Sequence, residues 1–382
     1  MTAIGLDQTI LTNARIVLAD QVMEGSVEMA GGVITAIGSG SSRGVDLEGD
    51  FLIPGLVELH TDHLETHYAP RPKVRWHPVA AVQAHDAQIA ASGITTVFDA
   101  IRVGTDEHAD MGAAELQVLA DAVTAGVRAE RLRADHFIHL RCEVSAPDCI
   151  EAFEAIMDHP LVRLASLMDH APGQRQFANP EAYKAYYQGK LKMSDAELAE
   201  FIARRSLESI TFSDRHRKIL AELSHARGIA LASHDDATEA HVDAALELGI
   251  RIAEFPTTLE AARASRDAGL AILMGGPNLV RGGSHSGNVS ARALAAAGLL
   301  DIVSSDYIPF SMLQSAFCLV DTVEGISVPE AIGLVTRRPA EAAGLDDRGE
   351  IALGKRADLV QVRLDDGVPI VRTVWRQGRR VL

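Results

Sequence analysis

The chain has 382 residues and an apolar fraction of 47%, which is enough for a sizeable buried core and excludes a disordered chain. Its formal net charge of −16 disfavours nucleic acid and anionic membrane surfaces as partners, because charges of like sign repel. The three cysteines form no C-x-x-C pair, so neither a cysteine zinc knot nor a disulfide framework is indicated. With no leading basic and apolar segment and no long apolar run, we expect a cytoplasmic protein without a membrane span.

Short strand patterns occupy both ends of the chain. Near the amino terminus, apolar or alternating stretches separated by glycines cover residues 10–17, 27–29 and 33–37. Near the carboxyl terminus, similar stretches cover residues 357–362, 368–371 and 374–375, with Asp365-Asp366-Gly367 as a hairpin turn. We predict that residues 1–53 and 345–382 form one small β-sandwich domain built from both termini.

The middle of the chain repeats one cassette, in which an alanine-rich helix ends at a glycine and a short apolar strand follows. Examples span residues 79–98, 215–233, 241–253, 259–274 and 291–304. Continuously apolar strands that alternate with helices imply a parallel sheet covered on both faces. With further strands at 56–59, 137–140 and 161–168, the pattern predicts a (β/α)₈ barrel over residues 54–344. A doubly wound open sheet is the alternative, but no G-x-G-x-x-G follows a strand.

One connection of this barrel is unusually long and runs from about residue 171 to residue 213. It contains Ser194-Asp195-Ala196-Glu197, which is a capping-box start for an inserted helix. Insertions of this length between barrel units are often active-site covers. We therefore predict that this segment covers the active site.

Polar side chains follow the apolar strands, at the end of a parallel barrel where active sites lie. Histidines and carboxylates in this density are what a divalent metal such as zinc needs, with manganese or iron as alternatives. His60 and Asp62 share one face of an extended strand and could reach one ion. We expect one or two ions, with Glu143 as a bridge and Asp306 also accepting a proton from water. The predicted ligands are His60, Asp62, Glu143, His170, His234 and Asp306.

A single histidine or aspartate after a strand is more often a helix cap or a turn former than a ligand. Asp235 and Asp236 precede Thr238 and could be helix N-caps, while Asp99 and Glu254 could simply hold loops. Five other histidines fall within helices or at their ends and are expected at the surface: His85, His159, His216, His225 and His241. The metal hypothesis therefore depends on the order of the whole set around the barrel.

Two segments resemble the amidohydrolase superfamily. Residues 54–60, Pro-Gly-Leu-Val-Glu-Leu-His, are similar to its Pro-Gly-h-h-D-x-H opening, and residues 354–360 resemble the turn by which it returns to its small β-domain. The usual H-x-H is replaced here by His60-Thr61-Asp62. A narrower resemblance to the PhnM family of the bacterial carbon–phosphorus lyase pathway rests on several blocks in one order, which include residues 60–67, 139–143, 168–176, 233–236, 275–278 and 304–307.

The narrower resemblance implies hydrolysis of α-D-ribose 1-methylphosphonate 5-triphosphate to the 5-phosphate and pyrophosphate, in phosphonate catabolism. It implies an anionic small-molecule substrate, and superfamily membership implies a homodimer. Cationic side chains and glycine-loop amides suit such an anion. The candidates for substrate binding are Arg71, Lys73, Arg141, Arg175, Asn278, Arg281, Gly282, Gly283 and Ser284.

Two rival functions stay open. A hydrolase of C–N bonds, acting on a cyclic amide or an aminated base, would keep the scaffold and change the bond that is broken. A metal-free scaffold protein would have lost its ligands, but the sequence has a histidine or carboxylate at each expected position. Pyrophosphate release, ammonia release and metal content separate the three functions.

Overall fold

The computed structural model describes residues 8–39, 43–105, 112–172, 174–175, 194–284 and 287–382. Its central feature is a parallel sheet of eight strands in sequence order, which confirms the predicted barrel. The strands are β6 (Leu56–Thr61), β7 (Ile94–Val103), β8 (Asp135–Glu143), β9 (Val162–Met168), β10 (Ala230–His234), β11 (Ile252–Glu254), β12 (Ala271–Gly275) and β13 (Ile302–Ser304).

The barrel closes between its first and last strands through residues just beyond β13. Thr61 and Asp306 form a parallel bridge, and the Asp306 amide donates to the His60 carbonyl at 3.0 Å. Apolar side chains fill the interior below this point, because alternate residues of each strand point inward. Members of this interior cluster include Val57, Phe98, Leu164, Ala232, Ile252 and Leu273. Polar side chains are left to the carboxyl ends of the strands, which form the barrel mouth.

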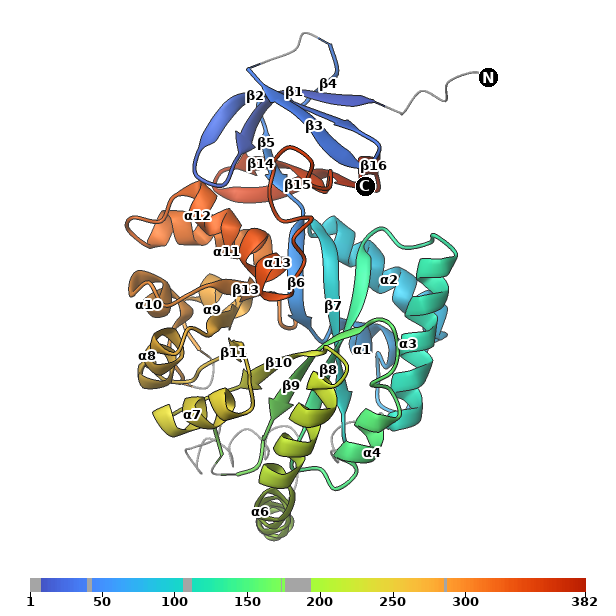
Figure 1. The fold of residues 1–382 in the computed structure, drawn as a ribbon, viewed down its shortest axis with the longest axis vertical. Helices are drawn as coiled ribbons and strands as arrows, with labels where there is room; N and C mark the ends of the chain where they lie inside the picture. Colours follow the sequence, from blue (N-terminus) through green and yellow to red (C-terminus); the bar gives the residue numbers. More distant parts are fainter. Residues whose placement is uncertain (1–7, 40–42, 106–111, 173, 176–193, 285–286) are drawn as a thin grey trace.

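Helices surround the barrel (Figure 1). They are α1 (His63–Tyr68), α2 (Pro78–Ala91), α3 (Ala113–Arg128), α4 (Cys149–Glu154), α6 (Asp195–His225), α7 (Glu239–Glu247), α8 (Leu259–Asp267), α9 (Gly276–Arg281), α10 (Ala291–Ala296), α11 (Ser311–Thr322), α12 (Val328–Gly333) and α13 (Arg337–Ala342). Gly93, Gly249 and Gly269 follow helices with φ of +84°, +69° and +75°, as predicted for the helix–glycine–strand cassette. In the described part of the chain, no helix combines the length and apolar character that a bilayer crossing requires.

Strands from both termini form a second, mixed sheet at one end of the molecule (Figure 1). They are β1 (Thr9–Val17), β2 (Val22–Ala30), β3 (Val33–Gly38), β4 (Val45–Asp46), β5 (Phe51–Pro54), β14 (Leu359–Asp365), β15 (Val368–Arg376) and β16 (Arg379–Arg380). β5 pairs with β14 and joins the two terminal segments. Met29 on β2 and Trp375 on β15 share one apolar core, so the sheet folds over itself as predicted for the small β-sandwich. The boundaries at residues 53/54 and 344/345 stay a prediction.

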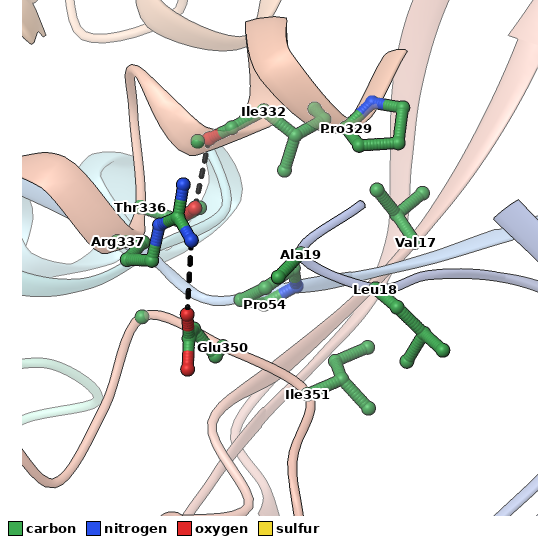
Figure 2. A pocket seen from close by; sticks show the side chains of 12 residues that line it. Val17, Leu18, Ala19, Pro54, Pro329, Ile332, Thr336, Arg337, Glu350 and Ile351 are labelled. Carbon is green, nitrogen blue, oxygen red and sulfur yellow. Dashed lines mark hydrogen bonds and ion pairs between the residues drawn. The ribbon is translucent and has the colours of Figure 1, made fainter. Parts of the chain in front are cut away.

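A small pocket lies where the terminal sheet meets α12 and α13. Figure 2 shows Val17, Ala19 and Pro54 on one side of it, and the Arg337 side chain donating to Glu350 at 3.4 Å on the other. Pro54 precedes β6, whereas the catalytic candidates follow the strands. The pocket is therefore at the opposite end of the barrel from the mouth.

The long connection after β9 leads into a single helix of 31 residues, α6. Its first turn has the predicted capping box, in which Ser194 and Glu197 each accept from the other's backbone amide. We expected an inserted helix separate from the one at 215–227, but α6 runs from Asp195 to His225 without a break. The proposed cover segment lies partly outside the described residues (173 and 176–193), so its covering role stays a prediction.

Candidate metal centre

Three side chains at the ends of β9 and β10 form a compact cluster of metal-binding atoms at the mouth. One ligand atom each from His170, His234 and Asp235 lies within 4.8 Å of the others. The Asp235 Oδ2 is 3.5 Å from the His234 Nε2 and 3.8 Å from the His170 Nε2. This oxygen is buried and has no hydrogen-bond partner among the described residues. A buried carboxylate oxygen beside two imidazole nitrogens, beyond hydrogen-bond distance, fits a divalent cation between them.

Asp235 is the member of this cluster that the sequence argument missed. We considered it a candidate N-cap of α7, but Thr238 is the N-cap residue. Asp235 has φ of +56°, a left-handed conformation that is strained for a residue other than glycine and is often found at functional sites. Burial raises the pKa of Asp235 to about 7. A cation beside the carboxylate would offset this penalty.

Glu254, at the end of β11, contacts the Nδ1 atoms of two predicted ligands, His60 and His234. Its two oxygens face the His60 Nδ1 at 3.2 Å and the His234 Nδ1 at 3.1 Å, and the Glu254 side chain is fully buried. An ionised Glu254 requires a proton on each Nδ1, which leaves each Nε2 with a free lone pair. A carboxylate behind an imidazole orients a metal ligand and raises its basicity. Glu254, which we considered a loop holder, therefore supports the site.

Burial also keeps the two histidines neutral. It lowers the pKa of His60 and of His234 to about 3, and the charge of Arg141 acts in the same direction at His60. A neutral imidazole is the form that ligates a metal. The two rings are stacked with centroids 5.7 Å apart, so both face the same part of the mouth.

Asp306 lies at the seam where the barrel closes and is half-buried. Burial and the neighbouring charge of Asp62 raise the pKa of Asp306 to about 7. Its backbone has φ of +57°, again a left-handed conformation at a carboxylate. Asp62 itself pairs with Arg141, whose Nη1 is 3.2 Å from the Asp62 Oδ2. The structure thus brings Asp62, Asp306 and Arg141 together as predicted, but pairs Asp62 with an arginine.

Glu143 occupies a different position from the bridging role that we predicted. Its Oε2 is 2.7 Å from the His170 Nδ1, and its Oε1 accepts from Ser145 at 2.6 Å and from Arg205 of α6 at 3.3 Å. Burial opposes its charge, but His170 and Arg205 hold the pKa of Glu143 far below its usual value. Both oxygens are occupied by protein donors. Glu143 therefore orients His170, and the predicted helix of the long connection contributes Arg205 to this network.

A second buried carboxylate fastens the seam beside His60. Glu58 accepts from the amides of His60 and Ser305, each at 2.6 Å, and from the Ser304 hydroxyl. Burial raises the pKa of Glu58 to about 7. These bonds join β6 to β13 directly under the mouth. Glu58 therefore fixes where His60 and Asp306 stand.

The predicted anion-binding residues lie in different environments. Arg141 lies at the mouth with its Nε buried and without a partner among the described residues. Arg71 and Arg281 are exposed near the mouth, and Lys73 is exposed on the loop after α1. Arg175 is buried against Asp236 and donates to the His234 carbonyl at 2.9 Å, so it supports the strand end.

The glycine loop after β12 is engaged with its own helix. The Gly282 and Gly283 amides donate to carbonyls of α9 at 3.1 Å and 3.0 Å, and Gly282 has φ of +82°. The Asn278 side chain binds the backbone of Val289 and Ala291. These groups terminate α9 and fix the following loop, which explains the glycines without an anion. Ser284 is at the edge of this loop, and its role stays a prediction.

Comparison with protein families matches residues 87–382 to the amidohydrolase family. The chain belongs to this family, as the opening segment predicted. It is 47% identical over 376 residues to the alpha-D-ribose 1-methylphosphonate 5-triphosphate diphosphatase of Escherichia coli (strain K12), covering 97% of this chain and 100% of that protein. It is 27% identical over 357 residues to an imidazolonepropionase of Streptomyces avermitilis, covering 88% and 81% of the two chains.

Solved structures share the architecture at low sequence identity. The N-acetylglucosamine-6-phosphate deacetylase of Pasteurella multocida superposes with a TM-score of 0.63 at 15% identity, covering 98% of this chain and 99% of that chain. The dihydropyrimidinase of Brevibacillus agri gives a TM-score of 0.62 at 14% identity, covering 98% and 95%. At these identities the likeness concerns the fold alone.

Proposed function

We propose that this protein hydrolyses α-D-ribose 1-methylphosphonate 5-triphosphate to the 5-phosphate and pyrophosphate. The observation that carries the proposal is the 47% identity, over 97% of this chain and 100% of the other, to a protein named as the diphosphatase of this compound. The mouth offers the groups that such a reaction requires: a candidate metal cluster, the half-buried carboxylate of Asp306, and Arg141, whose Nε–H has no partner among the described residues. The more distant imidazolonepropionases keep a C–N hydrolase as the second candidate.

The residues of the mouth fit a divalent metal of the zinc class. His60, His170, His234, Asp235 and Asp306 would hold it, in one or two positions, while Glu254 and Glu143 orient the imidazoles behind them. Three imidazole nitrogens and two carboxylates suit zinc, manganese and iron alike. When bound, the metal supplies an activated water and positive charge for the phosphoryl oxygens.

The protein's own groups then divide the remaining work. Water attacks the α-phosphorus, the bond from that phosphorus to the bridging oxygen breaks, and pyrophosphate leaves. Asp306 accepts the proton of the attacking water. Its burial makes it a better proton acceptor than a solvated aspartate. The buried walls of the mouth strengthen each of these interactions by excluding water.

Arg141 is the cation best placed for the phosphate chain. Its Nη1 is held by Asp62, so the guanidinium plane is fixed, and its Nε–H is left without a partner among the described residues. A charge-assisted hydrogen bond from this group to a phosphate oxygen is worth about 1.5–3 kcal/mol. Arg71, Lys73 and Arg281 stand in exposed segments around the mouth, where they would meet the distal phosphates.

The test is a parallel assay of the purified protein with the ribose phosphonate triphosphate, with ATP and with a panel of cyclic amides and aminated bases. Pyrophosphate release from the phosphonate triphosphate supports the proposal. Ammonia release or amide opening without pyrophosphate transfers the assignment to the C–N hydrolase. Metal content of the active protein separates both from a metal-free scaffold.

A further inference from the structure

A second group of histidines lies outside the barrel wall, between β7 and the helices α1 and α2. One ligand atom each from His85, Asp99 and His136 lies within 4.8 Å of the others, and all three side chains are fully buried. We expected His85 at the surface, and the structure contradicts this. Phe98 points into the barrel interior, so its neighbour Asp99 faces outward. The group is therefore separated from the mouth by the strand itself.

His85 has one ring nitrogen engaged and one idle. Its Nε2 is 2.7 Å from the Asp99 Oδ1, while the Asp99 Oδ2 is 2.7 Å from the His136 Nδ1. The His85 Nδ1 is completely buried and has no hydrogen-bond partner among the described residues. Burial opposes the charge of Asp99, but His136 and His85 hold its pKa far below the usual value. The ionised Asp99 requires the proton on the His85 Nε2, which leaves a lone pair on the Nδ1.

Two further imidazoles adjoin this ring. His63 and His67 are four residues apart on α1, hence on one face of the helix, and their ring centroids are 6.2 Å and 5.8 Å from that of His85. Their own centroids are 5.0 Å apart. The Nε2 atoms of both converge on one point, the Gln88 Oε1, at 2.9 Å and 3.1 Å. Both side chains are partly exposed, so an ion can enter from solvent.

We propose that His63, His67 and His85 form a second zinc-class site, with Gln88 or water as a fourth ligand and Asp99 as the carboxylate behind His85. Two histidines at i and i+4 on one helix are a recurrent zinc-binding pair. A third imidazole backed by a buried carboxylate completes the pattern of a structural site. His136, the other partner of Asp99, anchors that carboxylate from the barrel side.

The site would tie α1 to α2. α1 has only six residues, too few to be stable by itself, and it leads into the loop that contains Arg71 and Lys73. A cation held by both helices fixes this loop beside the mouth. Its role is therefore structural, and it is distinct from the metal centre of the barrel.

The experiment loads metal-stripped full-length protein with zinc, removes the excess and measures zinc per chain. His170→Ala removes a ligand of the barrel centre, and in this background we expect one equivalent of zinc to remain. Adding His63→Ala and His67→Ala should abolish this equivalent or weaken its binding by more than about 100-fold, because a lost ligand costs more than a lost supporting partner. His77→Ala, an exposed histidine at the start of α2, is the control and should change nothing.

Two further measurements keep the test independent of folding and of turnover. Zinc should raise the Tm of His170→Ala but not that of the variant that also lacks His63 and His67. His67→Cys should restore binding and, with cobalt, show a thiolate-to-metal charge-transfer absorption. Equal zinc content and affinity with and without His63 and His67, or a His67→Cys variant without that absorption, would overturn the proposal and leave a hydrogen-bonded histidine network.

Discussion

Glu254→Gln is the sharpest test of how the barrel centre is built. Glu254 faces the Nδ1 of both His60 and His234, at 3.2 Å and 3.1 Å. A glutamine has the same shape but only one carbonyl oxygen, so it can accept from one of the two rings. Its amide nitrogen would face the other Nδ1 and force the proton of that ring onto Nε2. That nitrogen could then no longer ligate a metal.

The expected loss of zinc affinity follows from the number of rings that position 254 can still support. A supporting carboxylate contributes about 10–100-fold to metal affinity, and the variant both removes the charge and misdirects one ligand. We expect the Kd for zinc to rise by about 100-fold, which corresponds to about 2.7 kcal/mol. The fold should survive, because the amide is isosteric and removes a buried charge.

Competition with a zinc chelator of known affinity measures this Kd directly. The matched control is Glu247→Gln, an exposed glutamate on the helix before β11, which should leave the Kd unchanged. A Glu254→Gln Kd within about twofold of the parent value would refute the assignment of both tautomers. It would then have to be concluded that His60 and His234 do not act as Nε2 ligands.

Four further outcomes are expected. Asp306→Asn should lower turnover by at least about 100-fold while zinc content is retained, as pyrophosphate release and metal analysis would show; unimpaired turnover removes it from the mechanism. Arg141→Gln should raise the KM for the triphosphate by about 10–100-fold, and an unchanged KM would place the phosphates elsewhere. In ¹⁸O-labelled water the label should enter the ribose 5-phosphate product, whereas label in pyrophosphate moves the attack to the β-phosphorus. Burial opposes the charge of His136, but Asp99 and Asp86 raise its pKa to about 10. The charged His136 therefore contributes fully to the free energy of unfolding below about pH 6.5, and this contribution is lost as the pH rises through about 10. His136→Gln should therefore cost about 3–5 kcal/mol of unfolding free energy near neutral pH and much less above pH 10, measured by urea titration in EDTA.

The barrel could be predicted from the sequence because its signals are local. A glycine after each helix marks where the strand begins, and continuous apolar runs identify strands that are buried on both faces. The position of the mouth could then be predicted as well, because the carboxyl ends of parallel strands all lie on the same side of the barrel. The long helix α6 was divided wrongly because the strand-by-strand pattern assigned its second half to the barrel. Residues 195–225 contain no glycine or proline, and this absence could have indicated one continuous helix.

The distinction between ligands and their supports could not be predicted in this way. Glu143 ends β8 and Asp235 directly follows β10, yet Glu143 contacts the Nδ1 side of the His170 ring and Asp235 the Nε2 side. The difference depends on which side of a ring a carboxylate occupies, and that is decided by packing between strands. His234 and Glu254 illustrate this, since they are register partners on neighbouring strands. The substrate, the homodimer and the cytoplasmic location stay predictions.

The segment that follows β6 links the two histidine systems. His60 lies near the end of β6 on the inner side, and Asp62 is the residue before α1, whose His63 and His67 lie beside His85 on the outer side. The place of Asp62, and with it the Arg141 that it holds at 3.2 Å, therefore depends on how firmly α1 is fixed. A cation on the outer side would restrict α1 and so pre-organise a phosphate-binding arginine on the inner side, which lowers the entropy lost on binding. We therefore expect the carboxylate at position 62 to act by orienting Arg141 at the mouth.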